Sequence, residues 1–541
     1  MASSLEKLRP GDALPRGREV ELVAARGECE AAQIAVRADA GLAALSAWAT
    51  PLRGPPPPQP RFAGQRRSGD ERGAPLAVAL YRVATLSLPL PSGPDGVAGE
   101  WPDPLVPARD PDFGEARRAF PVALGPGRLQ AIWVEVCVPE DAAPGERAGV
   151  VRLADGARPI AEVPVRLRVW PFALPATGTF AAAFGLPTRV GTRALGRPDD
   201  PVIARALAAI ALRHRVTPYV LSADPPDGAC AAARCALDWT RYDAEVGPVL
   251  DGTLVPGVRG AFAEVRIPCR VWDGPEADLA ATLRAWRRHF EERGWADRLR
   301  LYVLDEPSPE QLPELRRRAR LARAAGIRVF ETTLPAPGLA GVVDDFAPNL
   351  TLLDDRLPRA AEVNWSYASC MSHGCDERPA DGRRREELRE RSGWPGYEID
   401  RPGTAARAVP LLGVRRGLAG ELYYDMLHAW TGDPWKDPRA FAGNGDGTLL
   451  YPGWPEALGG ATPFPVGSIR LAIVRDALED AALVALARSV GEGRMADRFL
   501  ARLVPSARGW ERRPEPWLRA RRALGDAVAR RAAAWAAPAA P

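Results

Sequence analysis

The front third of the chain alternates apolar and polar residues in short runs, which are separated by turn-forming residues from about position 20 to position 169. Alternation with a period of two residues, interrupted by Gly, Pro and Asp, is typical of antiparallel strands. We therefore predict an N-terminal β-sandwich domain over residues 1–175, with a long surface loop over 55–72. The clearest strands cover 20–23, 33–36, 131–136 and 163–169.

Beyond residue 175 the pattern changes to short apolar runs separated by segments with helical periodicity. Eight such runs with intervening helices over about 300 residues predict a (β/α)8 TIM-like barrel, which we place at 176–490. Residues 491–541 are expected to add C-terminal helices and a disordered Ala/Pro tail. The predicted barrel strands are 180–186, 216–221, 262–268, 299–304, 328–331, 350–353, 363–367 and 421–424, and the clearest helices are 199–213, 275–293, 308–324, 403–417 and 468–488.

Composition and charge exclude several classes of protein. The 541 residues include 51 Gly and 56 Pro without the three-residue period of collagen, which indicates many turns around an ordinary core. The charge is nearly balanced, with 72 basic and 68 acidic residues and a net charge of +4. Because basic and acidic residues are interspersed, the sequence has no basic stripe and predicts no nucleic-acid partner.

The termini and the cysteines bear on the compartment. No run of 18 apolar residues is present, so we predict no membrane span. Residues 1–7 lack the apolar core of a signal peptide, which favours a cytoplasmic protein, or a periplasmic or secreted one if a leader has been removed. The seven cysteines are too few, and odd in number, for a disulfide scaffold.

Two adjacent carboxylates follow the fourth predicted barrel strand, which ends in Asp305, Glu306 and Pro307. The active site of such a barrel lies at the carboxyl ends of its strands, so both side chains would lie at the barrel mouth. Two ionised carboxylates this close repel each other, and the pKa of one should rise toward the range that a general acid needs. An alternative is that the pair only caps the helix that is expected to begin at Ser308.

Aromatic and polar residues follow two other predicted strands. Trp365 and Tyr367 lie on the seventh, Tyr424 and Asp425 at the end of the eighth, and Trp430 soon after it. Flat aromatic faces beside carboxylates suit sugar rings, so these five are candidate substrate-binding residues. Equally, the aromatic ones could fill the space between the barrel and its helices.

Other polar residues in this region have simpler explanations. Cys370, His373 and Cys375 place three potential metal ligands within six residues, but a structural zinc site needs a fourth ligand, and none stands at matching spacing. We expect a local disulfide or two free thiols there, and predict no metal and no cofactor. His428 is expected to be a structural imidazole, and Asp446 to serve a turn, although it could reach the site.

Several motifs resemble those of glycoside hydrolase family 123 and the related domain of unknown function 4091. The catalytic Asp-Glu pair of that family resembles Asp305 and Glu306 here, and the resemblance covers most of the chain. Segments 26–33 and 101–107 resemble its β-sandwich domain, and segments 444–447, 451–453, 468–470 and 475–480 resemble its C-terminal signature.

The resemblance implies an exo-acting β-N-acetylgalactosaminidase that retains configuration with the help of its substrate, a glycan or glycoconjugate. Asp305 would orient and stabilise the 2-acetamido group while the carbonyl oxygen of that group attacks C1. Glu306 would protonate the leaving oxygen and then deprotonate the incoming water. In an ordinary retaining glycosidase a carboxylate attacks C1 instead. The alternatives are a glycosidase with a different sugar specificity and a carbohydrate-binding protein without activity.

The chain departs from the family pattern at the eighth predicted strand. Glu421 and Tyr424 stand where the family commonly has Phe and Trp, within Gly-Phe-Leu-Tyr-Trp. The change leaves the sugar specificity open.

Overall fold

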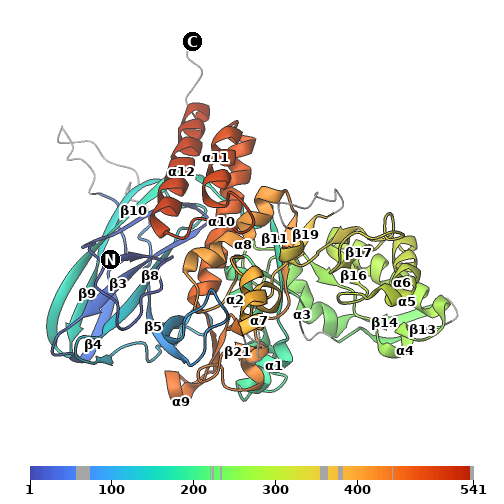
Figure 1. Cartoon of the computed structure of the whole chain (residues 1–541), viewed down its shortest axis with the longest axis horizontal. Coiled ribbons are helices and arrows are strands. Elements are labelled where there is room, and N and C mark those ends of the chain that lie inside the picture. Colours follow the sequence, from blue (N-terminus) through green and yellow to red (C-terminus); the bar gives the residue numbers. More distant parts are fainter. Residues whose placement is uncertain are drawn as a thin grey trace, which may run out of the picture.

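The computed structural model describes residues 1–55, 74–219, 221, 224–231, 234–353, 363–375, 382–440 and 443–536. Most of the predicted loop over 55–72 and the end of the predicted tail lie outside these residues. Figure 1 shows the N-terminal sheets at one end of the molecule, long helices in the middle, and a smaller sheet with its own helices at the other end.

Two five-stranded sheets make up the N-terminal part of the chain. Every pair in them is antiparallel except β2 with β10, which is parallel. Residues from both sheets, such as Leu22 and Ile34, form one hydrophobic cluster, because the alternating apolar side chains of each sheet face the other. One sheet holds β1 (Ala2–Ser3), β3 (Cys29–Arg37), β8 (Leu129–Cys137), β5 (Ala79–Leu88) and β6 (Gly99–Pro107); the other holds β2 (Val20–Arg26), β10 (Arg158–Ala173), β9 (Gly145–Asp155), β4 (Leu42–Ala49) and β7 (Val122–Leu124).

The next part of the chain holds two four-stranded parallel sheets, each resembling half of a barrel. Isolated bridges join them on one side, from Phe346 to Val363 and from Asn349 to Tyr367. On the other side the rings of Tyr219 and Phe262 lie 5.5 Å apart. The first sheet is β12 (Thr217–Tyr219), β11 (Ala181–Gly185), β20 (Gly420–Tyr423) and β19 (Trp365–Tyr367), and the second is β15 (Ala263–Glu264), β16 (Leu299–Tyr302), β17 (Arg328–Glu331) and β18 (Asp345–Phe346).

These strands follow one another in chain order from sheet to sheet, as the predicted barrel requires. In the described part of the chain, however, their backbone hydrogen bonds form two separate ladders rather than one continuous barrel sheet. The strands are only two to five residues long, so each ladder has few bonds to extend.

One predicted strand is wrong. Residues Leu350–Leu353 form a 3-10 turn, and the sixth strand is β18, Asp345–Phe346. Leu352 is 44% exposed, so the apolar run at 350–353 does not mark a buried strand. The other seven predicted strands overlap observed ones.

An insertion between β12 and β15 was not expected from the sequence. It holds a hairpin of β13 (Asp227–Ala231) and β14 (Arg234–Asp238), followed by α3 (Thr240–Asp251). A disulfide joins Cys230 and Cys235 across the hairpin. The remaining strands are β21 (Arg439–Ala440), β22 (Gly443–Asn444), β23 (Tyr451–Gly453) and β24 (Phe464–Val466).

The helices overlap the predicted ones, and several have clear end signals in the sequence. Ser468 caps α10 by accepting a hydrogen bond from the backbone N–H of Leu471, and Asp200 caps α2 in the same way through Val202. The helices are α1 (Thr188–Ala194), α2 (Pro201–Arg213), α4 (Cys269–Trp272), α5 (Glu276–Glu292), α6 (Leu312–Ala324), α7 (Gly382–Glu390), α8 (Gly403–Arg416), α9 (Pro455–Leu458), α10 (Ile469–Ser489), α11 (Gly493–Leu503) and α12 (Pro514–Ala536).

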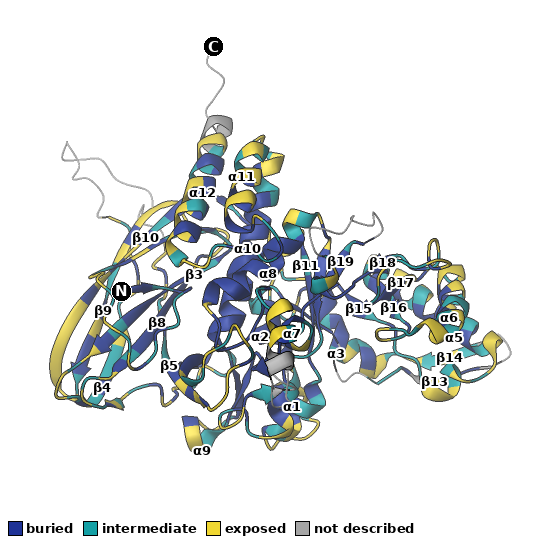
Figure 2. Ribbon diagram, viewed as in Figure 1, coloured by how far each residue is buried: buried dark blue, intermediate teal, exposed yellow. Residues whose placement is uncertain are grey.

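Helix α10 lies at the centre of the molecule and is buried along most of its length, as Figure 2 shows in dark blue. Its buried charges are paired, because an unpaired charge would be costly there. Several of the pairs reach the N-terminal sheets, so those sheets pack directly on the rest of the chain. The pairs across this interface include two from α12. They are Arg470 with Asp103 (2.8 Å), Arg475 with Glu135 (2.7 Å), and Arg521 with Glu28 (2.6 Å) and Glu30 (2.8 Å).

Within the described residues, no helix combines the length and the apolar character that crossing a membrane requires.

Candidate active site

The chain leaves the sheet at the end of β16 in a sharp turn that carries Asp305 and Glu306. Both side chains are exposed. Glu306 has a φ of 44°, in the left-handed region that residues other than glycine rarely adopt. Such a conformation costs about 1–3 kcal/mol and persists only where the surroundings hold it. The turn directs the two neighbouring carboxylates to different partners.

Asp305 faces β16 and the end of β17. Its Oδ1 accepts hydrogen bonds from the hydroxyl of Tyr302 at 2.5 Å and from that of Thr332 at 3.1 Å. The Thr332 oxygen also accepts a hydrogen bond from the backbone N–H of Glu306, at 2.9 Å. One threonine hydroxyl therefore contacts both members of the pair and holds the strained turn.

Glu306 faces β19, on the other half-barrel sheet. Its Oε1 accepts a hydrogen bond from the hydroxyl of Tyr367. Burial, and then Glu306, raise the pKa of the Tyr367 phenol, so Tyr367 remains a neutral donor. Tyr367, predicted as a substrate-binding residue, thus lies beside one of the predicted catalytic acids.

Glu331, at the end of β17, holds the backbone just before the Asp305–Glu306 turn. It is fully buried, and its Oε1 accepts a hydrogen bond from the backbone N–H of Val303 at 3.0 Å. Burial raises the pKa of Glu331 to about 9, so the side chain is a neutral carboxylic acid at pH 7. Neither Glu331 nor Thr332 was predicted from the sequence, although both lie at the end of a strand, where the active site of a barrel is expected.

Further acids gather at the same mouth. Burial raises the pKa of Tyr219, and the carboxylates of Glu264, Asp305 and Asp425 raise it further. These acids follow or end three different strands, β15, β16 and β20, and their charges all act on this one hydroxyl. Asp425, a predicted substrate-binding residue, follows β20 closely, and Glu264, which was not predicted, ends β15.

The other predicted binding residues are less accessible. Trp365 is 3% exposed and packs against the rings of Phe262 and Phe330 inside the half-barrels. Trp430 is also 3% exposed and donates to the carbonyl of Leu450 at 2.8 Å. These two tryptophans are core residues, as the alternative interpretation of the sequence allowed.

Tyr424 and Asp425 follow β20 directly. Tyr424 is partly buried, with its ring 5.9 Å from that of His428. Asp425 lies 3.7 Å from Nδ1 of His428 and raises the pKa of that imidazole. His428 therefore pairs with the acid that follows Tyr424.

The departure from the family pattern at Glu421 lies away from this mouth. Glu421 is buried, and the Tyr397 hydroxyl, which donates to its carboxyl group, lies 2.9 Å from Oε1 and 3.1 Å from Oε2. On β20 it alternates with Leu422, which packs inside the half-barrels, so Glu421 faces the opposite side of the strand. Burial raises its pKa to about 8.

Two cavities open beside the carboxylate pair. One, of about 560 Å³, is lined by Tyr302 and Val303, and we call it the Tyr302 cavity. The other, of about 590 Å³, is lined by Glu306, Thr332 and Tyr367, and we call it the Glu306 cavity. The Glu306 cavity has a member of the pair in its described lining, whereas the Tyr302 cavity adjoins the pair through Tyr302, which donates to Asp305.

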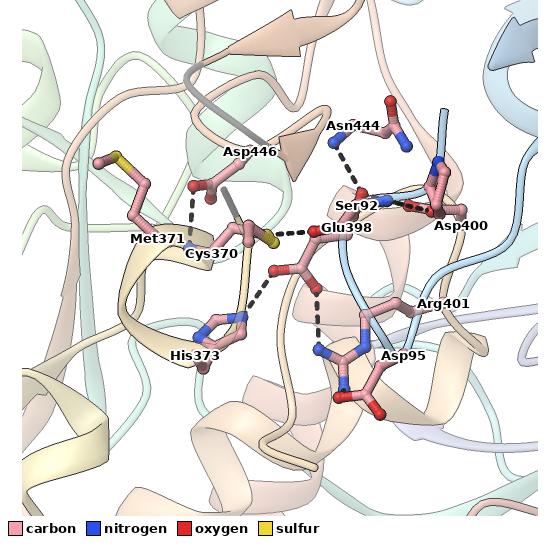
Figure 3. Close-up of a disulfide and its surroundings, with 12 residues drawn as sticks. Ser92, Asp95, Cys370, Met371, His373, Glu398, Asp400, Arg401, Asn444 and Asp446 are labelled. Atoms are coloured by element: carbon pink, nitrogen blue, oxygen red, sulfur yellow. Dashed lines mark hydrogen bonds and ion pairs between the residues drawn. A yellow bond between two sulfur atoms is a disulfide. The ribbon is translucent and has the colours of Figure 1, made fainter. Parts of the chain in front are cut away.

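Cys370 and Cys375 form a disulfide, one of the two alternatives expected from the sequence. Figure 3 shows Glu398 beside this bridge, between His373 and Arg401. Burial opposes the ionisation of Glu398, but His373 and Arg401 lower its pKa to about 2. Cys370, Cys375 and Glu398 are close enough to share a metal, yet sulfur atoms bonded to each other offer no thiolate.

Asp446 is also structural, as the turn interpretation expected. It is buried and accepts hydrogen bonds from the backbone N–H of Cys370 at 2.9 Å and from the hydroxyl of Tyr423 at 2.8 Å. Burial raises its pKa to about 6.

This chain is similar to known proteins in its fold rather than in its sequence. No family model and no curated protein matches the chain. The structure is similar to a family 123 glycoside hydrolase from Clostridium perfringens, solved in a study of glycolipid glycan hydrolysis, with 10% identity, a TM-score of 0.66, and coverage of 98% of this chain and 97% of that chain.

Two other glycoside hydrolases match at TM-scores too low to carry an argument. They are a family 5 xyloglucanase from Bacteroides ovatus (10% identity, 86% of this chain and 99% of that chain, TM-score 0.28) and a family 39 enzyme from Bacteroides cellulosilyticus (12% identity, 76% of this chain and 77% of that chain, TM-score 0.29).

The match to the Clostridium perfringens enzyme confirms the resemblance expected from the sequence as a resemblance of fold. Over nearly its whole length, this chain folds like a family 123 glycoside hydrolase.

Proposed function

We propose that this protein is a glycoside hydrolase that removes a terminal β-linked 2-acetamido sugar, such as N-acetylgalactosamine, by a retaining, substrate-assisted mechanism. The observation that carries the proposal is the Asp305–Glu306 turn, in which two adjacent carboxylates point to different partners within a fold shared with a family 123 enzyme. Neighbouring acids suit substrate assistance, because neither of them has to attack C1 from the far side of the sugar.

Asp305 is the residue that orients the acetamido group. Its Oδ1 is held by Tyr302 and Thr332, while Oδ2 has no hydrogen bond from the described residues and can accept the N–H of the sugar. An anionic Asp305 would stabilise the positive charge that develops when the acetamido oxygen attacks C1.

Glu306 is the general acid and then the general base. It lines its cavity and is accessible to a glycosidic oxygen, to which it transfers a proton as the bond to C1 breaks. When water replaces the leaving group, the same carboxylate takes a proton from it. Tyr367 keeps the carboxyl in place by donating to Oε1.

The domain organisation belongs to the same proposal. Residues 1–175 form a β-sandwich domain, 176–490 a (β/α)8 catalytic barrel, and 491–541 a C-terminal helical extension and tail. The disulfides Cys29–Cys137, Cys230–Cys235 and Cys370–Cys375 favour an oxidising compartment over the cytoplasm.

A panel of chromogenic β-glycosides with and without the 2-acetamido group tests the function. We expect hydrolysis of the acetamido sugars only, competitive inhibition by the corresponding thiazoline, and no covalent labelling by a 2-fluoro sugar. Cleavage of sugars that lack the acetamido group, or a 2-fluoroglycosyl ester on Asp305 or Glu306 detected by mass spectrometry, would contradict the mechanism. A control with both residues changed to amides should be inactive.

A further inference from the structure

The two cavities beside the catalytic pair differ in how their charges are balanced. In the Tyr302 cavity the arginines have acidic partners within the lining: Arg189 donates to Asp224 at 2.8 Å, and Arg266 lies 3.3 Å from Glu264. Positive and negative charges therefore offset one another there, as suits the hydroxyl groups of a neutral sugar.

In the described lining of the Glu306 cavity, the basic residues outnumber the acidic ones. Its described lining contains two arginines, Arg391 and Arg508, and one acid, which is Glu306 itself. Arg391 is exposed and donates to the carbonyl of Met371 at 2.7 Å, and among the described residues it pairs with no carboxylate. An arginine has five N–H donors, so most of those on Arg391 remain available to a ligand.

Arg508 reaches the same wall from beyond α11. Its guanidinium lies 5.2 Å from the centre of the Trp394 ring and donates to the carbonyl of Glu390 at 2.7 Å. Trp394 also lines the cavity. The packing against Trp394 and the bond to Glu390 fix the guanidinium in place, which lowers the entropy lost when it binds an anion.

The chemistry of the site decides which part of a substrate meets these arginines. Under the proposed function, on which this inference rests, Glu306 protonates the glycosidic oxygen, so the leaving group lies beside Glu306. The terminal sugar lies toward Asp305 and its partner Tyr302. The cavity with the two arginines is therefore the leaving-group side.

We propose that the Glu306 cavity binds an anionic leaving group, so that the preferred substrates join the terminal acetamido sugar to an acidic sugar that carries a carboxylate or a sulfate. Arg391 and Arg508 form charge-assisted hydrogen bonds to that anion. Polar residues of the same lining, such as Asn349 and Ser372, are available to the hydroxyl groups of the acidic sugar.

Three matched disaccharides test this proposal. Each carries N-acetylgalactosamine in the same β linkage, to glucose, to glucuronic acid, or to glucose 6-sulfate. We expect kcat/KM for the wild-type protein to be about tenfold or more higher on one or both acidic substrates than on the glucose one, because a hydrogen bond to a charged group is worth more than a neutral one. The larger of the two effects identifies the anion. High salt should reduce the preference.

Substitutions at two neighbouring arginines supply the control. Arg391→Met should reduce the acidic-to-neutral ratio of kcat/KM by about tenfold, and Arg391→Lys should reduce it less. Arg389→Met removes the same charge from an exposed residue of α7 outside the described lining, and should keep the wild-type ratio. Thermal unfolding of each variant checks that it is folded.

The outcomes separate this proposal from the function on which it rests. If the wild-type protein cleaves the glucose substrate as well as the acidic ones, or if Arg391→Met and Arg389→Met change the ratio alike, the anionic leaving group is refuted while the glycosidase stands. If chromogenic acetamido glycosides are not cleaved either, the proposed function itself fails.

Discussion

The strained backbone of Glu306 makes Thr332 the residue on which the geometry of the site depends most. Its hydroxyl oxygen accepts the N–H of Glu306 and its hydrogen is donated to Asp305, so one group fixes both carboxylates. A turn that costs about 1–3 kcal/mol relaxes when such a contact is lost.

Thr332→Val keeps the shape of the side chain and removes the hydroxyl. We expect kcat on an activated acetamido glycoside to fall by about ten- to a hundredfold, since a small misplacement of catalytic groups has effects of this size. Thr332→Ser, which keeps the hydroxyl, should retain most of the activity. Equal activity of the Val and Ser variants would show that the contact does not position the pair.

Glu306→Gln tests the role of the acid. Turnover of substrates with poor leaving groups should fall by about 10²–10⁴-fold, the usual contribution of general acid catalysis. Aryl glycosides with good leaving groups need little protonation and should lose less in the glycosylation step. A series of leaving groups with increasing pKa measures this dependence, and an equal loss across the series would remove Glu306 from the role.

At the scale of elements, the backbone hydrogen bonds between β16 and β17 end at Tyr302 and Phe330, and the side chain of Glu331 then accepts the next N–H of the chain. Glu331 accepts the Val303 N–H where β16 leaves the sheet, and it does so as a neutral acid with a pKa of about 9. In the unfolded chain the same group ionises near its ordinary value of 4.5. The folded chain therefore holds a proton that the unfolded chain releases between these two pH values.

Stability due to Glu331 should accordingly fall as pH rises from about 4.5 to about 9, by at most about 1.4 kcal/mol per pH unit. Glu331→Gln cannot ionise, so its stability relative to the wild-type protein should increase over this range. Urea unfolding at pH 5.5 and pH 8.5 gives the free energy of unfolding of both proteins. Subtracting the wild-type value from the variant value at each pH cancels the contributions of the other buried acids, which the two proteins share. A difference that does not change with pH would place the pKa of Glu331 near its ordinary value.

The elements also show what the sequence could and could not predict. The strand Arg328–Glu331 was predicted with its observed bounds, because an apolar run marks it. Strand β18 was missed because two residues are too few to show a pattern. Its Asp345 is held by ion pairs with Arg300 and Arg328 from other strands, and such long-range contacts are not visible in the local sequence.

The same limit applies to the site. Asp305 and Glu306 were found because they follow a strand directly. Trp365 and Tyr367 lie two residues apart on one face of β19. The alternation of apolar and polar residues gives both the same position, so it does not predict that Trp365 lies in the core while the hydroxyl of Tyr367 reaches Glu306. The partnership of Tyr367 with Glu306 depends on which strands become neighbours, and that is set by the whole fold.

For the whole molecule, the buried arginines determine whether the N-terminal sheets stay attached. Arg521 pairs with Glu28, Glu30 and Asp480. Its removal leaves Glu28 and Glu30 buried without an ion-pair partner among the described residues, whereas Asp480 keeps its pair with Arg407. We expect Arg521→Met to reduce the free energy of unfolding by about 3–5 kcal/mol and to expose the sheets to proteolysis.

The neighbouring Arg522 provides a matched control, because it is exposed. Arg522→Met should change the stability by no more than about 0.5 kcal/mol. Thermal unfolding and limited proteolysis compare the two variants with the wild-type protein. Release of a stable fragment ending near residue 175 from the wild-type protein would show instead that the sheets are only tethered.

The pairing of Arg521 with Glu28 also constrains how the protein can be made. The two residues are 493 positions apart, so at about 5–20 residues per second a ribosome needs about 25–100 seconds to deliver the arginine after the glutamate. During that interval the nascent N-terminal sheets present a surface of unpaired acids to water. Glu28 and Glu30 therefore stay solvated by water until α12 has been made, and the part of the interface that contains them forms only then.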